Sequence, residues 1–417
     1  GGAHLCSIQY YLRFWLSICR ICTRPAVFLA EFTAEIVLDD LTACTVVIMK
    51  KTLAAVAVLG AFAGSAMAAD VTLYGKVDLG LQYTNMQNEA GVDGADRDSY
   101  SMDSGNGSAS RWGLKGSEQI SENLTVGFNL EDGIKADTGV TGDMFDRVAM
   151  LYVDTNYGKL SMGRFGALDS GTGPIDMVAG FSASGTGYGT DILDQGEVLY
   201  TYSRVDNAIA YSTPEFAGMK LTVMTSLQTT GSTSGEKGEG THYVDRYHGI
   251  GLTGQWGALG AGIVVSMADP ANEAGADKQD DDAYNVTAGV NYDFGVAKAF
   301  LAANYFDGGY SSGWTAMGDV EFQGAGDYSQ WGTVASVAVP LSAGELQAMI
   351  GYAEGTFEPV DGADIDVTRY TVGAYYEYPL SKRTYLYTAA GYTQTESDNW
   401  DADQKYTQVI GGLVHNF

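Results

Sequence analysis

The residues of this chain most able to do chemistry are charged side chains between positions 111 and 204. The segment from Phe165 to Ser203 has no lysine or arginine and carries five acidic residues: Asp169, Asp176, Asp191, Asp194 and Glu197. Basic residues flank it in the sequence: Arg111, Lys115, Arg147, Arg164 and Arg204. If the fold brought the two groups together across a narrow passage, they would select ions by charge, because a charge acts more strongly where little water surrounds it.

Signals for bond-making catalysis are nearly absent. The histidines after residue 68 are His242, His248 and His415, and none belongs to a metalloprotease, phosphate-loop or nucleophile-elbow motif. A hydrolase built from His248 and a serine of another segment stays an alternative. The acidic runs near Asp280 and Asp364 lack the ligand spacing of an EF-hand. We therefore expect no enzyme activity, no cofactor and no bound metal.

A secretory signal peptide is indicated at residues 49–68. Met49 is followed by two lysines, an apolar run at 52–64, and the small-x-small sequence Ala66–Met67–Ala68. All four cysteines, at positions 6, 19, 22 and 44, precede Met49, and a lone Cys-x-x-Cys pair is weak evidence for a metal or redox site. We expect residues 1–48 to be upstream translation that is not native, residues 49–68 to be the signal peptide, and residues 69–417 to form the functional domain.

The charge balance excludes one class of partner. The chain holds 23 basic and 51 acidic residues, of which residues 1–68 hold five and four, so residues 69–417 carry a net charge of −29. Binding of nucleic acid needs a basic face, so no nucleic-acid partner is expected. An acidic surface instead suits divalent cations or the headgroup region of a membrane.

The sequence behind the signal peptide alternates between apolar and polar residues. Between Val71 and Tyr83 the odd positions are mostly apolar, while the even ones include Thr72, Lys76 and Asp78. No uninterrupted apolar stretch of 18 residues follows, so no membrane-spanning helix is expected. Since only helices and closed barrels satisfy every backbone group in lipid, this alternation behind an export signal favours an outer-membrane β-barrel.

Sixteen alternating segments follow one another, joined by seven short turns and eight long loops, the first long loop near residues 84–107. The segments begin near Val71, Ser108, Leu124, Arg147, Lys159, Asn207, Lys220, Tyr247, Leu259, Tyr284, Ala297, Gln330, Glu345, Thr368, Thr384 and Tyr406. Regular sorting of connections by length is typical of an up-and-down barrel with extracellular long loops. Sixteen strands leave an aqueous lumen. We predict an all-β fold, a 16-stranded antiparallel transmembrane β-barrel.

Strand parity assigns two of the basic residues to one face. Arg111 and Lys115 share a face of their segment, and Trp112 and Leu114 share the other. A lysine or arginine that faces lipid at mid-membrane costs about 2–4 kcal/mol. The parity therefore puts both charges in the lumen.

These stretches together resemble the trimeric general porins of Gram-negative bacteria, of the neisserial and burkholderial type. The resemblance covers residues 49–417 and rests on VTLYGKVD at 71–78, SRWGLKGSE at 110–118, YGKLSMGR at 157–164, DNAIAYSTP at 206–214 followed by FAG at 216–218, and GLVHNF at 412–417. It implies passive diffusion of small hydrophilic solutes across the outer membrane, a homotrimer, and a third loop that folds into the lumen.

The resemblance also implies roles for single residues. Matching positions in the family contribute to an arginine cluster at the constriction, which assigns that role to Arg111, Arg164 and Arg204. Arg164 has the parity of outward-facing neighbours, so a bulge or the end of its strand would have to turn it inward. Phe417 resembles the terminal aromatic residue that the barrel-assembly machinery reads.

Selectivity is expected to follow the balance of the two charged groups. Five carboxylates on an inward third loop would face four or five cations, and the domain is strongly acidic, so we expect a weak preference for cations. The arginine cluster implied by the resemblance favours anions instead. Besides solutes, expected partners are outer-membrane lipids, lipopolysaccharide and the assembly machinery. An adhesin or surface-interaction barrel is the main alternative function, and a membrane-embedded hydrolase is a lesser one.

Overall fold

A closed wall of antiparallel strands forms this protein. The computed structural model describes residues 71–88, 97–188, 192–194, 198–232, 234–235, 238–271, 282–309, 326–398 and 403–417. The predicted upstream segment and signal peptide, residues 1–48 and 49–68, lie outside the described residues. Within them, sixteen strands make up the wall, as the alternation predicts, and the prediction of a 16-stranded antiparallel barrel is confirmed.

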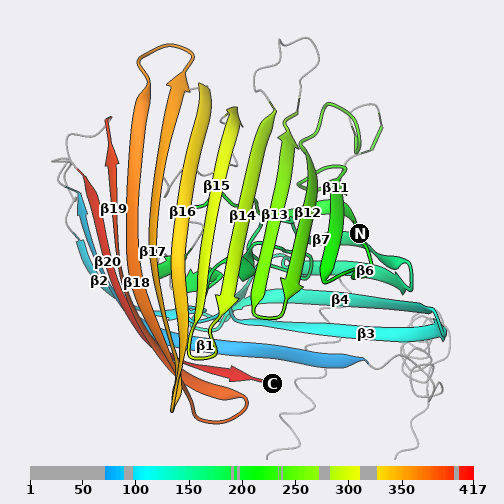
Figure 1. Ribbon diagram of the computed structural model, residues 1–417, viewed down its shortest axis with the longest axis horizontal. Helices are drawn as coiled ribbons and strands as arrows, with labels where there is room; N and C mark the ends of the chain where they lie inside the picture. Colours follow the sequence, from blue (N-terminus) through cyan, green and yellow to red (C-terminus); the bar gives the residue numbers. More distant parts are fainter. Residues whose placement is uncertain are drawn as a thin grey trace, which may run out of the picture. The chain divides into compact units, whose positions relative to one another are not determined.

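The strands of the wall follow one another in chain order (Figure 1). They are β1 (Thr72–Asn88), β3 (Arg111–Ser121), β4 (Leu124–Lys135), β6 (Val148–Thr155), β7 (Gly158–Gly166), β10 (Arg204–Ser212), β11 (Met219–Ser226), β12 (Arg246–Trp256), β13 (Leu259–Asp269), β14 (Ala283–Asp293), β15 (Lys298–Gly309), β16 (Gly326–Leu341), β17 (Gly344–Pro359), β18 (Ile365–Pro379), β19 (Thr384–Ser397) and β20 (Gln404–Asn416). Smaller elements are β2 (Arg97–Ser104), β5 (Val140–Thr141), β8 (Thr186–Tyr188), β9 (Ile192–Asp194) and the 3-10 turn η1 (Ala179–Phe181).

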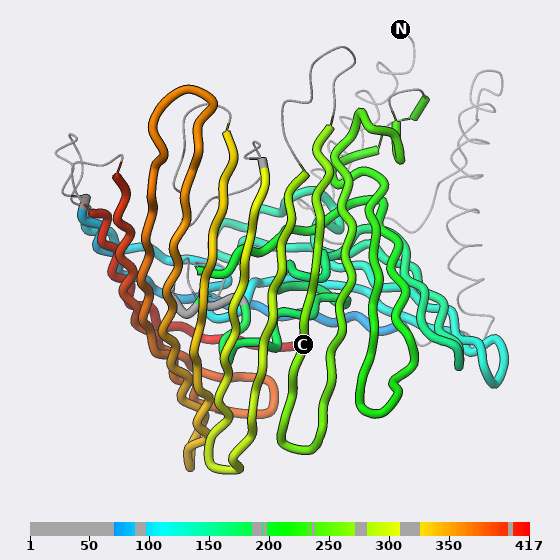
Figure 2. The backbone as a smooth tube through the Cα atoms, turned by 45° about the horizontal axis from the view of Figure 1, so that its top comes forward, coloured from blue at the N-terminus to red at the C-terminus, as the bar shows by residue number. Residues whose placement is uncertain are grey.

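The first and last strands close the ring. β1 pairs antiparallel with β20 from Lys76↔Asn416 to Asn88↔Gln404. On its other edge β1 pairs with β3 and, farther along, with β2. Figure 2 shows the red C-terminal strand beside the blue first strand. Closure leaves no unpaired sheet edge to be satisfied in lipid, which is what a membrane-spanning sheet requires.

The wall has an apolar outer face and a polar inner face. Ile263, Leu301, Ile350 and Val372 lie on the same face of neighbouring strands and are exposed. Polar residues such as Thr222, Asn304 and Thr371 are buried on the other face, inside the barrel. Among the described residues, no helix has both the length and the apolar character that crossing a membrane requires.

The connections differ at the two ends of the barrel. Figure 2 shows the tight β12–β13 and β14–β15 turns at the end opposite to the β17–β18 loop. Every strand of the wall begins within four residues of its predicted start. The expected loop at 84–107 is wrong in part, because β1 runs on to Asn88 and β2 begins at Arg97. The two strands pair up to Met86↔Arg97, and the rings of Tyr83 and Tyr100 pack at 4.9 Å.

Candidate pore constriction

One cavity of about 830 Å³ inside the barrel brings charged residues of the wall next to the third loop, residues 167–203 between β7 and β10. Arg111, Arg147 and Arg204, here called the arginine wall, line it together with Glu131. The remaining lining residues come from the third loop (Gly171, Thr172, Gly173, Pro174, Ser184), from the segment between β2 and β3 (Gly105, Gly107, Ser108, Ala109), and from other strands (Asn129, Val148, Tyr375, Glu377, Tyr385). Polar groups from distant parts of the sequence therefore surround one passage.

Glu131 of β4 is the centre of the charged side of this cavity. Its Oε1 lies 2.7 Å from Nε of Arg147, and its Oε2 lies 3.5 Å from Nε of Arg111. The hydroxyl of Tyr74 donates to the same Oε2 at 3.0 Å. Arg204 is not bound to Glu131, and its Nη2 donates to Oγ1 of Thr172 on the third loop at 3.0 Å. One carboxylate thus serves two guanidinium groups, and the arginine wall keeps an excess of positive charge.

Strand register explains why these side chains meet. Glu131 lies opposite Gly113 on β3 and opposite Val148 on β6. Arg111 and Arg147 are each two or fewer positions from those partners, so their long side chains reach Glu131 from both neighbouring strands. Glu131 is the functional residue that the sequence analysis missed. Its parity with Asn129, opposite to that of Leu130, was an available signal for a lumen-facing position.

The third loop is held against the inner wall by apolar side chains that lie over glycines. A Cβ added at Gly262 would lie 2.8 Å from the ring of Phe181, and one at Gly289 would overlap that ring. In the same way, a Cβ at Gly351 would lie 2.8 Å from the side chain of Val198. Phe181 and Val198 are fully or almost fully buried. Glycines on β13, β14 and β17, which have no side chain, therefore make room for the loop.

Asp169 corrects the expectation that the third-loop carboxylates face the passage. Its side chain is only 1% exposed and accepts hydrogen bonds from Tyr247 Oη (2.7 Å), from Asn285 Nδ2 (2.9 Å) and from Ser266 Oγ. Those donors belong to β12, β14 and β13. A buried carboxylate must find such donors, and here it finds them in the wall. Asp169 therefore anchors the loop and does not line the cavity.

The carboxylate of Asp176 accepts hydrogen bonds from backbone amides of its own loop. Oδ1 accepts from the amides of Gly171 (2.7 Å) and Val178 (3.3 Å), and Oδ2 accepts from Ala179 (2.9 Å). Burial raises the pKa of the Asp176 carboxyl to about 6, against the opposite effect of these backbone donors. Asp176 therefore shapes the turn that carries Gly171 into the cavity, and it is not among the residues that line it.

The other sequence-predicted residues are placed differently. Asp194 ends β9 and is half-buried. Asp191 and Glu197 lie outside the described residues. Lys115 lies on the same face of β3 as Arg111, four residues farther along the strand, with Nζ 5.0 Å from the centre of the Tyr74 ring. Lys115 is exposed and does not line the cavity.

Arg164 lies near Arg204 but is not among the residues that line the cavity. Its Nε donates to the backbone oxygen of Asp146 at 2.7 Å, and its Nη1 pairs with Asp206. In the β6–β7 register it lies opposite Ala149, on the outward parity of Met162. A register shift does occur nearby, between Val205 and Ala208 of β10, but it leaves Arg164 paired with Asp206. The assignment of Arg164 to the arginine cluster at the constriction therefore stays a prediction.

Comparison with known proteins identifies the family. The model of the Gram-negative porin family matches residues 54–398. An outer membrane porin protein of Bordetella pertussis is 30% identical over 397 residues, which covers 88% of this chain and all of the relative. Outer membrane porin protein 32 of Delftia acidovorans is 29% identical over 358 residues, which covers 81% of this chain and 88% of the relative.

Solved structures agree on the fold. The anion-selective porin from Comamonas acidovorans superposes with a TM-score of 0.58 at 22% identity, covering 84% of this chain and all of that one. OmpF of Salmonella typhi, in complex with daunomycin, gives a TM-score of 0.55 at 17% identity and covers 84% of this chain and 98% of its own. This chain therefore belongs to the Gram-negative porins, outer-membrane β-barrels that act as diffusion channels and not as enzymes.

Proposed function

We propose that this porin is a water-filled channel for small hydrophilic solutes with a preference for anions. The observation that carries the proposal is the arginine wall: Arg111, Arg147 and Arg204 line one cavity beside Glu131. Glu131 is shared between two of these arginines. In a narrow passage the excess positive charge attracts anions and repels cations.

The weak cation preference expected from the sequence depended on third-loop carboxylates in the passage. Asp169 is instead buried among hydrogen-bond donors, and Asp176 binds backbone amides. Glu131 and Glu377 also line the cavity, so three arginines there face two carboxylates, and the other acidic residues that the structure describes are not among the lining residues. The effect of those other residues is screened over a Debye length of about 8 Å at physiological salt. The charges at the constriction should therefore decide selectivity, and they favour anions.

Reversal potentials across a potassium chloride gradient in planar bilayers test this proposal. We expect the sign of an anion-selective channel, with a smaller anion preference in Arg111→Gln and Arg204→Gln. Lys382→Gln, at an exposed turn, is the matched control and should behave like the wild type. A cation-selective wild type would reverse the proposed preference, and a protein without conductance would contradict the channel function itself.

We also propose a homotrimer. A solved OmpT of Vibrio cholerae described as a trimer form has a TM-score of 0.52 at 17% identity, covering 84% of this chain and all of that one, and supports only the likeness of fold. Unboiled native gels and light scattering in mild detergent should give about three times the monomer mass. This is the mass of a closed assembly with threefold cyclic symmetry. A stable monomer would count against it.

Phe417 is proposed as the residue that the assembly machinery reads. Its amide donates to the carbonyl of Gly75 at 3.0 Å, and the amide of Gly75 donates back at 3.2 Å. A Cβ at Gly75 would overlap the Phe417 ring. Deletion of Phe417 should sharply lower the amount of protein in the outer membrane without blocking export. Phe417→Tyr, which keeps a terminal aromatic residue, should leave that amount close to that of the wild type. Normal insertion of the deletion variant would refute the role.

Cleavage after Ala68 is proposed for the exported chain. The support is the order of a basic start, an apolar run and Ala66–Met67–Ala68. N-terminal sequencing of protein purified from outer membranes should begin at or next to Ala69. A peptide from residues 1–48 would contradict it. Interaction of the acidic loops with lipopolysaccharide through divalent cations stays a prediction.

A further inference from the structure

The part of the chain that pairs with β1 on the side of β3 is interrupted between β2 and β3, and the residues between these two strands turn into the lumen. β1 pairs with β3 up to Lys76↔Arg111 and with β2 from Leu79↔Ser104. Over that interval β1 advances three residues, whereas the partner chain advances seven. Four extra residues must therefore leave the plane of the wall. They belong to the segment Gly105–Ser110, here called the inward segment.

The inward segment lines the same cavity as the arginine wall. Gly105, Gly107, Ser108 and Ala109 are among its lining residues. Gly105 has a φ of +91°, a backbone conformation that favours glycine, and so starts the turn away from the wall. The carbonyl of Ala109 accepts a hydrogen bond from Nη1 of Arg111 at 2.9 Å. The segment therefore occupies space in the passage and also holds the first arginine of the wall.

A single buried carboxylate, Asp78 of β1, fastens this segment. Asp78 is 0% exposed, and its Oδ2 accepts from the amides of Gly107 and Ser108, both at 2.6 Å. Its backbone amide donates to Oγ of Ser110 at 2.9 Å. Lys76, two residues earlier, donates from Nζ to Oγ of Ser108 at 2.8 Å. Hydrogen bonds to a charged group are among the stronger ones, so these contacts specify one position for the segment.

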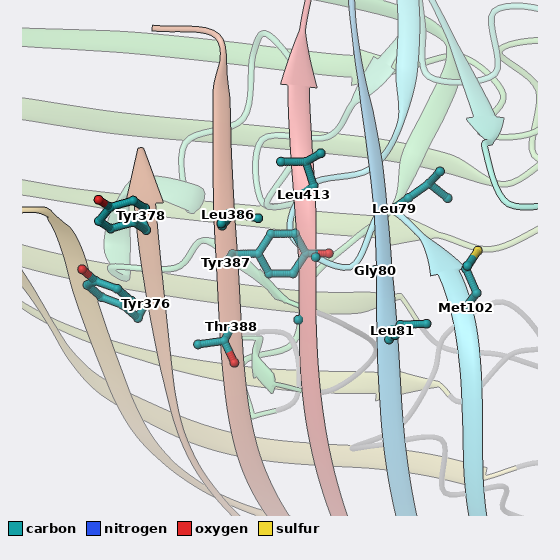
Figure 3. Close-up of a pocket in the computed structure, with 12 residues that line it drawn as sticks. Leu79, Gly80, Leu81, Met102, Tyr376, Tyr378, Leu386, Tyr387, Thr388 and Leu413 are labelled. Carbon is teal, nitrogen blue, oxygen red and sulfur yellow. The ribbon is translucent and has the colours of Figure 1, made fainter. Parts of the chain in front are cut away.

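Tyr387 of β19 completes the anchor from the far side of the closing seam. Its hydroxyl donates to Oδ1 of Asp78 at 2.7 Å. Figure 3 shows the Tyr387 side chain reaching from β19 across β20 toward Gly80 of β1. A Cβ at Gly80 would lie 2.7 Å from that hydroxyl, one at Gly107 would lie 2.8 Å from the ring, and one at Gly412 would overlap it. Three glycines therefore clear the path along which Tyr387 meets Asp78.

We propose that the inward segment is a second constriction element, separate from the third loop, and that Asp78 is the positioning residue that holds it and thereby aims Arg111. The proposal deepens the diffusion-channel function and rests on it. The element presents backbone and small side chains to the passage. It therefore narrows the passage without adding charge and leaves selectivity to the arginine wall.

Thiol modification of the folded channel tests the element directly. All cysteines of the sequence precede residue 69, so Ala109→Cys, at an exposed position of the inward segment, gives a single reactive thiol in the exported barrel. A negatively charged methanethiosulfonate should lower the single-channel current of this variant by about twofold or more, as expected for bulk added at a constriction. Ser117→Cys is the matched control and should react with little loss of current, because Ser117 is exposed on the face of β3 that carries Arg111 and lies six residues from Arg111 toward the β3–β4 turn.

The positioning role of Asp78 is read in the same assay. Asp78→Asn puts an amide where two backbone amides and a hydroxyl donate, so the segment should lose its fixed position. We expect larger open-channel current noise, a lower anion preference as Arg111 is released, and weaker block of Ala109→Cys in the double variant. Tyr387→Phe should give a smaller change in the same direction, and Asp154→Asn, at an exposed site on β6, should give none.

The outcomes separate this inference from the channel function. A wild type without conductance would contradict the channel function. Suppose that the wild type conducts and that mass spectrometry shows full modification of Ala109→Cys. An unchanged current in that variant would then overturn the second constriction element alone. Unchanged noise and selectivity in a folded Asp78→Asn would overturn the positioning role, and if that variant fails to fold, Tyr387→Phe and the cysteine assay still decide.

Discussion

Two segments leave the wall of this barrel and narrow its lumen, and they are held in different ways. The third loop is long and lies on the wall mainly through buried apolar side chains such as Phe181 and Val198, which occupy the space left by glycines. The inward segment is six residues long and depends on hydrogen bonds to one buried carboxylate, Asp78. A long loop has enough apolar side chains to make a small core, whereas the short segment is held by hydrogen bonds to its backbone and to its serine hydroxyls.

Both segments nevertheless present small, uncharged groups to the cavity. The third loop contributes Gly171–Pro174 and Ser184, and the inward segment contributes two glycines, a serine and an alanine. Their aspartate anchors, Asp169 and Asp78, are buried and do not line the cavity. These two aspartates hold the segments in place, while the arginine wall supplies most of the charge that a solute meets in the cavity.

The largest expected effect breaks the apolar attachment of the third loop. Phe181→Ala removes a ring that is 4% exposed, and large-to-small changes at buried phenylalanines cost about 3–5 kcal/mol. We expect a lower transition temperature in the heat-modifiability of gel migration and a noisier open channel. Phe216→Ala, at a position 80% exposed, is the control. A variant with wild-type stability and noise would show that the loop does not depend on this contact.

A smaller effect is expected where the third loop uses a carboxylate, as the inward segment does. Asp169→Asn places an amide among Tyr247, Ser266 and Asn285, and each buried polar group left without a partner costs about 1–3 kcal/mol. Limited proteolysis should cut within residues 167–203 faster than in the wild type. Asp361→Asn, at an exposed loop position, should not change the cutting rate. Equal rates in all three proteins would remove Asp169 from the list of anchors.

Glu131→Gln tests whether the arginine wall sets the charge of the passage, and not the third loop or the inward segment. The change leaves Arg111 and Arg147 without their shared carboxylate, so the ratio of anion to cation permeability should rise by about twofold or more. Bi-ionic or gradient reversal potentials measure this ratio. Glu118→Gln, exposed on β3, is the control. A falling ratio would show that the arginine wall is not the dominant charge.

The smallest expected effect concerns Asp176, a third-loop carboxyl with a raised pKa. Because burial raises the pKa of Asp176 to about 6, the carboxyl is mostly ionised at pH 7, and acidification to pH 5 protonates most of it. Ordinary carboxyls titrate near pH 4 and change little in this window. Loss of this negative charge near Gly171 should slightly raise the anion preference at pH 5. Asp176→Asn should flatten the change, and a pH profile identical to the wild type would exclude Asp176 as its source.

Much of the fold follows from local pattern. Alternation and turn chemistry predict strand positions well, because a residue in a barrel wall faces either lipid or water and its polarity records which. The error at residues 84–107 has the same origin. That hairpin continues as strand where most residues are polar, and the alternation of Tyr100 and Met102 with Ser99 and Ser101 is too short to separate strand from loop.

The site was less predictable because it depends on distant partners. The sequence places Arg111 in the lumen by parity, and the cavity lining agrees with that position. It also shows that the third loop is acidic, but not which way each carboxylate turns. Asp169 meets donors 78, 97 and 116 residues away, and Arg164 meets Asp206, 42 residues away. The residues next to Asp169 or Arg164 in the sequence do not indicate such a distant partner.

The sequence alone is enough to predict a barrel of sixteen strands, because backbone satisfaction in lipid allows few ways to use alternating strands. The tertiary structure alone decided what the barrel does with its charges. Whether a carboxylate lines a pore or fastens a loop depends on whether hydrogen-bond donors wait in the wall behind it, and closure of the ring is what brings those donors there. Asp78 and Tyr387, 309 residues apart, meet only because β1 and β20 close the barrel.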